Sequence, residues 1–172
     1  MSELAAFYDA STEGETIGNR LPDGTYVFAV EDTEVDEWDD GRPRLTIMTR
    51  VVAGEYEGQY GPRLQLSLGE SSGVAKATGK PFTITAEDNA KRLRVTIKTI
   101  HDAPIRMRNP GAYNSDMLED IAAALSNKDE FIGTTKTKDG SEYANFSRIY
   151  SVDEPPKKFS DPRRQAAFSL PS

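Results

Sequence analysis

Cysteine is absent from this chain, and histidine occurs once, at position 101. The first absence excludes disulfides, thiolate zinc sites, iron–sulfur clusters and thiol catalysis. A single imidazole excludes a multi-histidine metal centre and leaves general acid–base chemistry without a second specific partner. No apolar run approaches the ~18 residues of a membrane span, and the acidic first residues lack a signal-peptide pattern. We therefore expect a soluble cytoplasmic protein that is not an enzyme and has no cofactor, no metal and no membrane contact.

The 172 residues are enough for one domain, and 37% of them are hydrophobic. The net charge of −7 is unevenly spread: residues 1–40 hold twelve acids and one base, whereas residues 41–108 hold six acids and twelve bases. Because binding depends on the local field rather than on the net charge, the basic middle keeps a nucleic-acid partner possible.

Alternating and helical periodicities predict a β-rich domain over residues 21–152. Residues 1–20 are polar and acidic and predict a flexible arm, while the Pro- and Lys-rich residues 153–172 predict a disordered tail. Residues 34–40, between the first two expected strands, indicate a solvated acidic hairpin tip. Residues 71–80, between the third strand and the first helix, indicate a small-residue connection. The expected strands are residues 25–30, 44–52, 60–68, 131–138 and 141–152, and the expected helices are 86–100 and 115–126.

This order of elements is typical of a five-stranded OB-type barrel, mainly β, with an α-helical insert of two helices between strands 3 and 4. A generic α+β sandwich is the alternative, because three consecutive antiparallel strands and a helical excursion also fit it.

Two motifs with possible chemistry are better explained structurally. The acids around Asp36 fail as a calcium loop, because Trp38 takes the third position and Ile47 takes the twelfth, where a glutamate belongs. His101 follows the last apolar residue of a basic helix, where it favours a cap role.

The outward face of the sheet is the expected binding surface. If Leu45, Ile47 and the leucines of the third strand fill the barrel, the basic side chains between them face outward, where OB folds bind single-stranded nucleic acid. Aromatic side chains would stack on bases, and Tyr26, Phe28 and Tyr60 are expected in the core instead. The predicted nucleic-acid-binding residues are Arg44, Arg50, Arg63, Gln65, Lys136, Lys138, Tyr143, Phe146, Arg148 and Trp38.

A second basic feature follows the first predicted helix. It is either an additional phosphate-binding surface or the solvent-exposed face of an amphipathic helix, and the second interpretation is favoured. Its members are Lys91, Arg92, Arg94, Lys98, Arg106 and Arg108.

Several segments together resemble a bacteriophage family of OB-type single-stranded-DNA-binding proteins, long catalogued only as of unknown function. They are Leu-Pro-Asp-Gly-Thr-Tyr (21–26), Arg-Leu-Thr-Ile (44–47), Val-Ala-Gly-Glu-Tyr-Glu-Gly (52–58) and the stretch from Phe-Ile-Gly to Asp-Gly-Ser-Glu-Tyr-Ala-Asn-Phe (131–146). The resemblance covers residues 20–152 and implies a phage replication or recombination protein in the cytoplasm of the infected host cell. Many such proteins end in an acidic tip that recruits partners, and residues 161–172 here lack one.

The sequence thus predicts non-catalytic binding of single-stranded DNA with little sequence preference, with phage or host replication and recombination proteins as possible further partners. The alternative is a protein–protein interaction module, or a DNA-mimic inhibitor, that uses the acidic N-terminal arm. A phage nuclease is less favoured, because no metal site supports cleavage.

Overall fold

The computed structural model describes residues 21–75, 78–125, 128–137 and 143–163. Its principal sheet has five antiparallel strands in the order β3-β2-β1-β6-β7, and β4 and β5 form a separate hairpin. The strands are β1 (Gly24–Glu37), β2 (Pro43–Val51), β3 (Leu64–Ser67), β4 (Ser71–Val74), β5 (Pro81–Ile84), β6 (Glu130–Thr137) and β7 (Ala144–Ser151), and the helices are α2 (Ala86–Ile100) and α3 (Ser115–Ala124).

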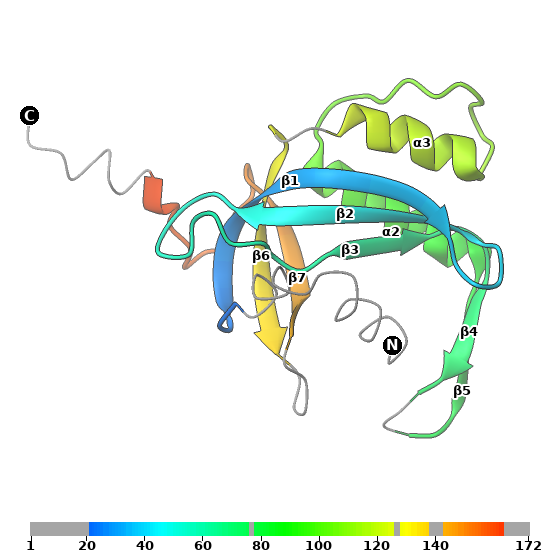
Figure 1. The fold of residues 1–172 in the computed structure, drawn as a ribbon, viewed down its shortest axis with the longest axis horizontal. Helices are drawn as coiled ribbons and strands as arrows, with labels where there is room; N and C mark the ends of the chain where they lie inside the picture. Colours follow the sequence, from blue (N-terminus) through cyan, green and yellow to red (C-terminus); the bar gives the residue numbers. More distant parts are fainter. Residues whose placement is uncertain (1–20, 76–77, 126–127, 138–142, 164–172) are drawn as a thin grey trace, which may run out of the picture.

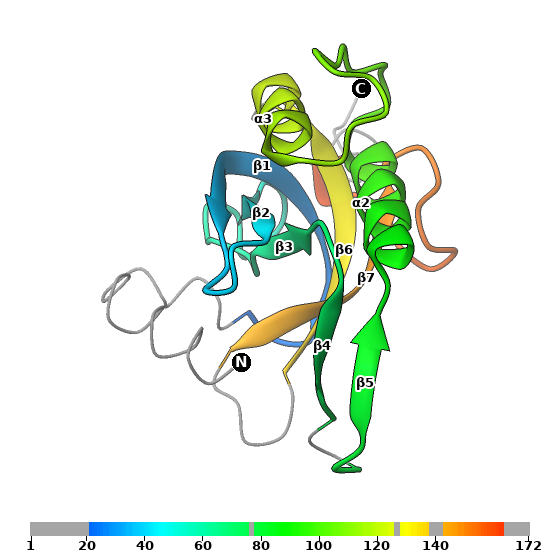
Figure 2. The ribbon, with the colours of Figure 1, turned by 90° about the vertical axis from the view of Figure 1, so that its right-hand side faces the viewer.

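The five-stranded sheet curls into a nearly closed barrel, which is mainly β and fits an OB-like architecture (Figure 2). The sheet begins and ends at β3 and β7, and α2 contacts both of these edge strands. The helix therefore covers the edges at which the barrel stays open, which protects their unpaired backbone groups. Helix α3 lies over β1 and β2 (Figure 1).

Both helices begin where the sequence predicts. The Thr85 hydroxyl accepts a hydrogen bond from the Asp88 backbone N–H, and the Asn114 side chain does the same for the first turn of α3. Such caps satisfy backbone donors that a helix leaves free at its N-terminus. Each helix turns an apolar stripe to one core, which also holds Phe28, Leu45 and Phe131.

Two connections between strands differ from the sequence-based expectation. The acidic run does not begin the hairpin tip at Glu34, because β1 continues to Glu37 and the turn closes between Trp38 and Arg42. Residues 71–80 are not a plain connection, because β4 forms at their start and pairs with β5, which follows them, and this hairpin extends away from the barrel (Figures 1 and 2). These strands are four residues each, so neither is long enough to show a clear period of two.

The chain after β7 packs on the outside of the barrel as far as Arg163. Phe159 packs against a small cluster formed by Val27, Ala53 and Ile132, and Arg163 donates to both carboxylate oxygens of Glu130. The predicted arm at 1–20 and the rest of the predicted tail, 164–172, lie outside the described residues. Neither described helix is long and apolar enough to span a membrane.

Candidate nucleic-acid interface

Strand β2 separates core side chains from outward ones as its alternation predicts. Leu45 and Ile47 are fully buried, whereas Arg44 before them and Arg50 after them lie on the opposite face with part of their surface exposed, although Thr46 on that same face is also buried. The side of the sheet that carries Arg44 and Arg50 of β2 and Gln65 of β3 is here called the β2–β3 face, and Trp38 and Tyr60 are counted with it. Strand β1 borders this face with acidic residues, since Asp36 lies opposite Arg44 in the antiparallel register.

At one end of β2, a carboxylate, a guanidinium and an aromatic ring form a triad. Arg44 donates from Nε and Nη2 to the two oxygens of Asp36, at 2.7 and 2.6 Å. Its guanidinium carbon lies 4.3 Å from the centre of the Trp38 ring, and the Trp38 indole N–H donates to Ser67 Oγ at 2.6 Å. A bidentate carboxylate and a stacked ring together fix the plane of the guanidinium.

The other end of β2 repeats this triad. Arg50 donates to the two oxygens of Glu31 at 2.9 and 2.6 Å, and its guanidinium carbon lies 4.6 Å from the centre of the Tyr60 ring. Arg50 also donates to the Tyr60 hydroxyl at 3.0 Å. The bond to Glu31 raises the pKa of Arg50 above its usual value, so this guanidinium stays charged at any working pH.

Trp38 sits among acids, but two of these acids are already paired with arginines. Asp36 is bound by Arg44, and Asp40 accepts a hydrogen bond from Arg42 Nε at 2.6 Å. The backbone N–H of Arg42, followed by its side chain, lowers the pKa of the Asp40 carboxyl. Arg42 also approaches the Trp38 ring, with 5.9 Å between guanidinium carbon and ring centre. The charge that would repel a phosphate chain near Trp38 is therefore partly neutralised.

The sequence-based placement of Tyr60 in the core is wrong. Tyr60 is 36% exposed and pairs with Arg50 across an isolated antiparallel bridge. The regular register joins Ile47 to Leu64, so the segment from Tyr60 to Leu64 holds one residue more than the facing part of β2. This extra residue turns Tyr60 to the outer face, as one-residue slips do in strands.

Gly61 permits this arrangement next to the core. A Cβ atom at Gly61 would lie 2.4 Å from the Phe28 ring and 2.5 Å from the Thr49 hydroxyl, both of which belong to the buried interior. The main chain at this position passes too close to the core for any larger residue. Because the main chain at Gly61 lies against the core, the neighbouring Tyr60 is held just outside the core.

The predicted residues of β6 and β7 divide between the two faces of the sheet. Phe146 packs edge-on against Phe28, with ring centres 4.9 Å apart, so its ring lies on the core side. Arg148 is exposed and lies over the Tyr150 ring at 5.0 Å, and Lys136 is exposed on the same strand pair. Tyr143 is half-buried, and Lys138 lies outside the described residues.

Arg63 and Gln65 complete the predicted set on the β2–β3 face. Both are half-buried, and Gln65 lies opposite Thr46 of β2 in the register. This register places Gln65 between the two triads, and Arg63 directly precedes β3. The residues that sequence reasoning missed there are Arg42, Glu31 and Tyr60, and only the Gly61–Pro62 pair after Tyr60 hinted that the strand period breaks.

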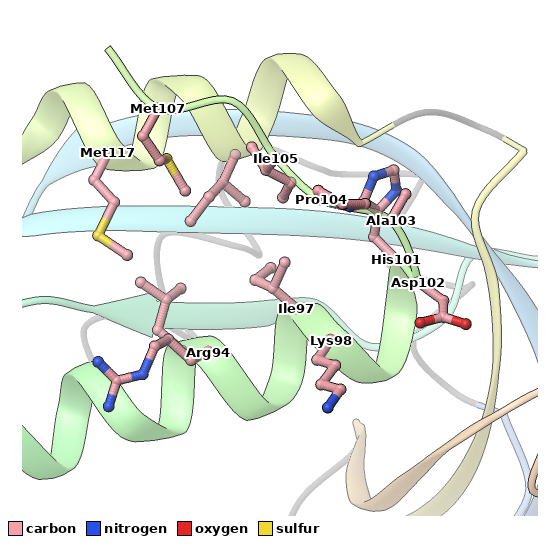
Figure 3. A pocket seen from close by; sticks show the side chains of 12 residues that line it. Arg94, Ile97, Lys98, His101, Asp102, Ala103, Pro104, Ile105, Met107 and Met117 are labelled. Atoms are coloured by element: carbon pink, nitrogen blue, oxygen red, sulfur yellow. The ribbon is translucent and has the colours of Figure 1, made fainter. Parts of the chain in front are cut away.

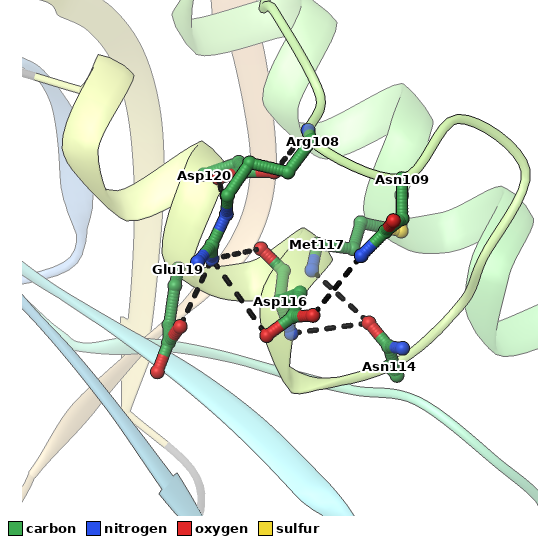
Figure 4. Close-up of polar contacts among 7 residues, drawn as sticks. All are labelled: Arg108, Asn109, Asn114, Asp116, Met117, Glu119 and Asp120. Carbon is green, nitrogen blue, oxygen red and sulfur yellow. Dashed lines mark hydrogen bonds and ion pairs between the residues drawn. The ribbon is translucent and has the colours of Figure 1, made fainter.

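The second basic feature is less uniform than its sequence indicates. Arg108 is held by acids of α3: it donates to Asp120 at 2.7 Å and to Glu119 at 3.0 Å (Figure 4). Arg94 donates to the Tyr113 hydroxyl. Within the described part of the chain, no ion pair engages the four remaining members, Lys91, Arg92, Lys98 and Arg106.

His101 ends α2 and is joined to the chain before β6. Its backbone N–H donates to Ile97, and its ring Nδ1 lies 2.8 Å from Asp129 Oδ1. Among the described residues, no group of three acids, histidines or cysteines is placed to hold a metal ion. The contacts of His101 are therefore those of a helix cap.

No family model matches the chain, and no curated protein matches it.

Proposed function

We propose that the protein binds single-stranded DNA, without catalysis and with little sequence preference, across the β2–β3 face. The observation that carries this proposal is the repeated carboxylate–arginine–aromatic triad, Asp36–Arg44–Trp38 at one end of β2 and Glu31–Arg50–Tyr60 at the other. The OB-type topology, in which such proteins bind nucleic acid on strands 2 and 3 and the adjoining loops, belongs to the same proposal.

Each triad supplies what an unpaired base and its phosphate need. Bases of any sequence can stack on an aromatic ring, at about 1–3 kcal/mol per base, and an arginine held flat can stack or bind phosphate. The two arginines are six residues apart on β2, which is about 20 Å along an extended strand. Such a separation suits a ligand that runs along the face and contacts both ends.

The acids of β1 limit the positive charge of this face. Asp36 and Glu31 cancel much of the charge of Arg44 and Arg50, so fewer counterions are released on binding than a bare arginine row would release. We expect about 3–5 phosphate contacts, some of them from exposed cations such as Lys136 and Arg148, and a slope of log affinity against log salt of roughly −2 to −3.5.

The test is a titration of labelled single-stranded and duplex oligonucleotides of equal length at two salt concentrations. Single strands should bind more tightly than duplex, because stacking on Trp38 and Tyr60 needs unpaired bases. Equal affinity for both, or no binding at low salt, would overturn the proposal.

A protein-interaction module is the second candidate, and one observation favours it. The β4–β5 hairpin carries Val74 and Phe82 with 62% and 44% of their surface exposed. Exposed apolar side chains on a projecting hairpin are typical of contact surfaces between proteins. Absence of nucleic-acid binding in the titration would favour this candidate.

The cellular setting remains part of the proposal. The resemblance implies a role in phage DNA replication or recombination in the cytoplasm of the infected host, with replication and recombination proteins as further partners. A strand-coating activity of low sequence preference suits that role.

A further inference from the structure

A cavity of about 400 Å³ opens between α2, α3 and the segment that joins them (Figure 3). It lies apart from the β2–β3 face, because its walls come from the two helices and from residues 101–107. Its size falls within the ~300–1,000 Å³ of typical ligand pockets.

The floor of this cavity is apolar and adaptable. Leu93 and Ile97 of α2 and Ile121 of α3 line it, and the side chains of Met107 and Met117 point into it (Figure 3). Methionine side chains are flexible and polarisable, so they fit irregular aliphatic and aromatic groups. Because these side chains offer few hydrogen-bonding groups for a base edge, the floor favours a hydrophobic side chain as its occupant.

The rim is cationic along α2. Arg94 and Lys98 lie one helical turn apart, and Arg94 bonds only the uncharged Tyr113 hydroxyl among its described partners. The rim also carries one exposed acid, Asp102. The His101 ring is paired with Asp129. An occupant with carboxylates beside its hydrophobic residues would complement this rim.

One end of this chain has that chemistry and the other does not. Residues 3–9 read Glu-Leu-Ala-Ala-Phe-Tyr-Asp, so that Leu4, Phe7 and Tyr8 stand between two acids. Residues 164–172 contain Phe168 and Leu170 but carry no acidic side chain and begin with an arginine. Charge complementarity therefore selects the N-terminal segment.

The segment is also long enough to reach the cavity. The eleven residues from 10 to 20 connect it to Leu21, the first described residue, and can span up to about 36–40 Å when extended. A chain of this length folds to a radius of gyration of about 16 Å, so the reach is comparable with the diameter of the domain.

We propose that residues 3–9 dock in the cavity between α2 and α3, with Phe7 and Tyr8 on the methionine-lined floor and Glu3 and Asp9 near Arg94 and Lys98. The cavity is then a site for an acidic, aromatic segment of the same chain.

The methionines allow a direct test in the full chain. Of the four methionines, Met107 and Met117 line the cavity, whereas Met48 lies on β2. With methionine methyl groups labelled for NMR, we expect nuclear Overhauser contacts from the Phe7 and Tyr8 rings to the Met107 and Met117 methyls. Replacing both rings, Phe7→Ala with Tyr8→Ala, should shift these two methyl signals and leave that of Met48 in place. Unchanged Met107 and Met117 signals would overturn the proposal.

Charge variants give the matched control. Arg94→Glu with Lys98→Glu should remove the contacts to Phe7 and Tyr8, since the acidic segment would meet a negative rim. Lys91→Glu with Arg92→Glu makes the same change of charge on the same helix, outside the cavity lining, and should leave most of them. Equal losses of the Phe7 and Tyr8 contacts in the two pairs of variants would contradict docking at this rim. An unchanged Met48 methyl signal verifies that each variant folds.

Discussion

Arginines on the β2–β3 face and cations on α2 differ in how they are held. Arg44 and Arg50 are each fixed by a carboxylate and a ring, whereas Lys91, Arg92 and Lys98 have no ion pair among the described residues. Because Arg44 and Arg50 are already held in one orientation, they lose little further entropy on binding. The cations of α2 instead contribute positive charge that attracts any phosphate chain. We therefore expect Arg44 and Arg50 to make specific contacts with single strands, and the cations of α2 to contribute only general attraction.

The largest effect is expected from the two rings of the triads. Trp38→Ala with Tyr60→Ala should weaken single-strand binding more than about 30-fold, because two stacking contacts are worth at least ~2 kcal/mol together. Titration of a labelled single strand measures it. The control pair, Phe82→Ala with Tyr113→Ala, removes two exposed rings elsewhere, and a greater loss from that pair would move the binding surface away from β2 and β3.

Replacing the arginines of the face compares the two regions directly. The triple change of Arg44, Arg50 and Arg63 to alanine should weaken binding more than tenfold, above ~1.4 kcal/mol, and flatten the salt slope by up to ~2 units. Its effect on stability should be small at Arg50, whose partly exposed ion pair contributes about 0–1 kcal/mol, and larger at Arg44, whose side chain is only 14% exposed and whose loss leaves Asp36 without this partner.

The matched triple replaces Lys91, Arg92 and Lys98 of α2 with alanine, three cations that no ion pair among the described residues engages. Long-range attraction alone would make this triple at least as harmful as the arginine triple, because no carboxylate of the described residues forms an ion pair with its cations. We expect the arginine triple to be clearly worse. A more damaging helix triple would show that the helical region carries the binding surface.

Removing the acids of the triads separates orientation from net charge. Glu31→Gln with Asp36→Asn frees two guanidiniums, so we expect binding at low salt to rise a few-fold and the salt slope to steepen by up to ~1.4 units. Glu55→Gln with Glu57→Gln makes the same change of net charge in the turn after β2, where both acids are exposed. If both pairs change affinity and slope equally, only net charge matters.

The smallest effect concerns the carboxyl of Asp40 at the edge of the face. Its pKa is lowered by the N–H and side chain of Arg42, so its contribution to stability is present above the unfolded pKa, ~3.9, and is lost as pH falls through the lower folded pKa. Asp40→Asn should therefore lower the melting temperature slightly at pH 7, and the difference should vanish below both pKa values. A difference that grows on acidification would contradict this sign.

Periodicity and caps predicted the regular part of the fold. The alternation of β2 located its buried side, and Thr85 and Asn114 marked the starts of the helices, because these signals are local in sequence. The β4–β5 hairpin was missed because its short strands contain Ser, Gly, Pro and Thr rather than an apolar alternation.

The candidate site was predictable in its arginines but not in its pairing. Arg44 and Arg50 follow from alternation, whereas their partners Asp36 and Glu31 depend on the register between β1 and β2, including the irregularity between Val30 and Asp32. Register depends on packing across strands, which a single sequence does not reveal. The exposure of Tyr60 has the same origin, because it follows from one extra residue before Leu64.

Intrinsic fluorescence of Trp38, the single tryptophan of the chain, tests the central claim most directly. Titration of the full-length protein with an unlabelled single strand should quench this fluorescence to saturation, and added salt should weaken the effect in step with the affinity measured by a labelled strand. Duplex of equal length should quench it less at the same concentration. Saturable binding of the labelled strand with no change in Trp38 fluorescence would contradict stacking at the β2–β3 face.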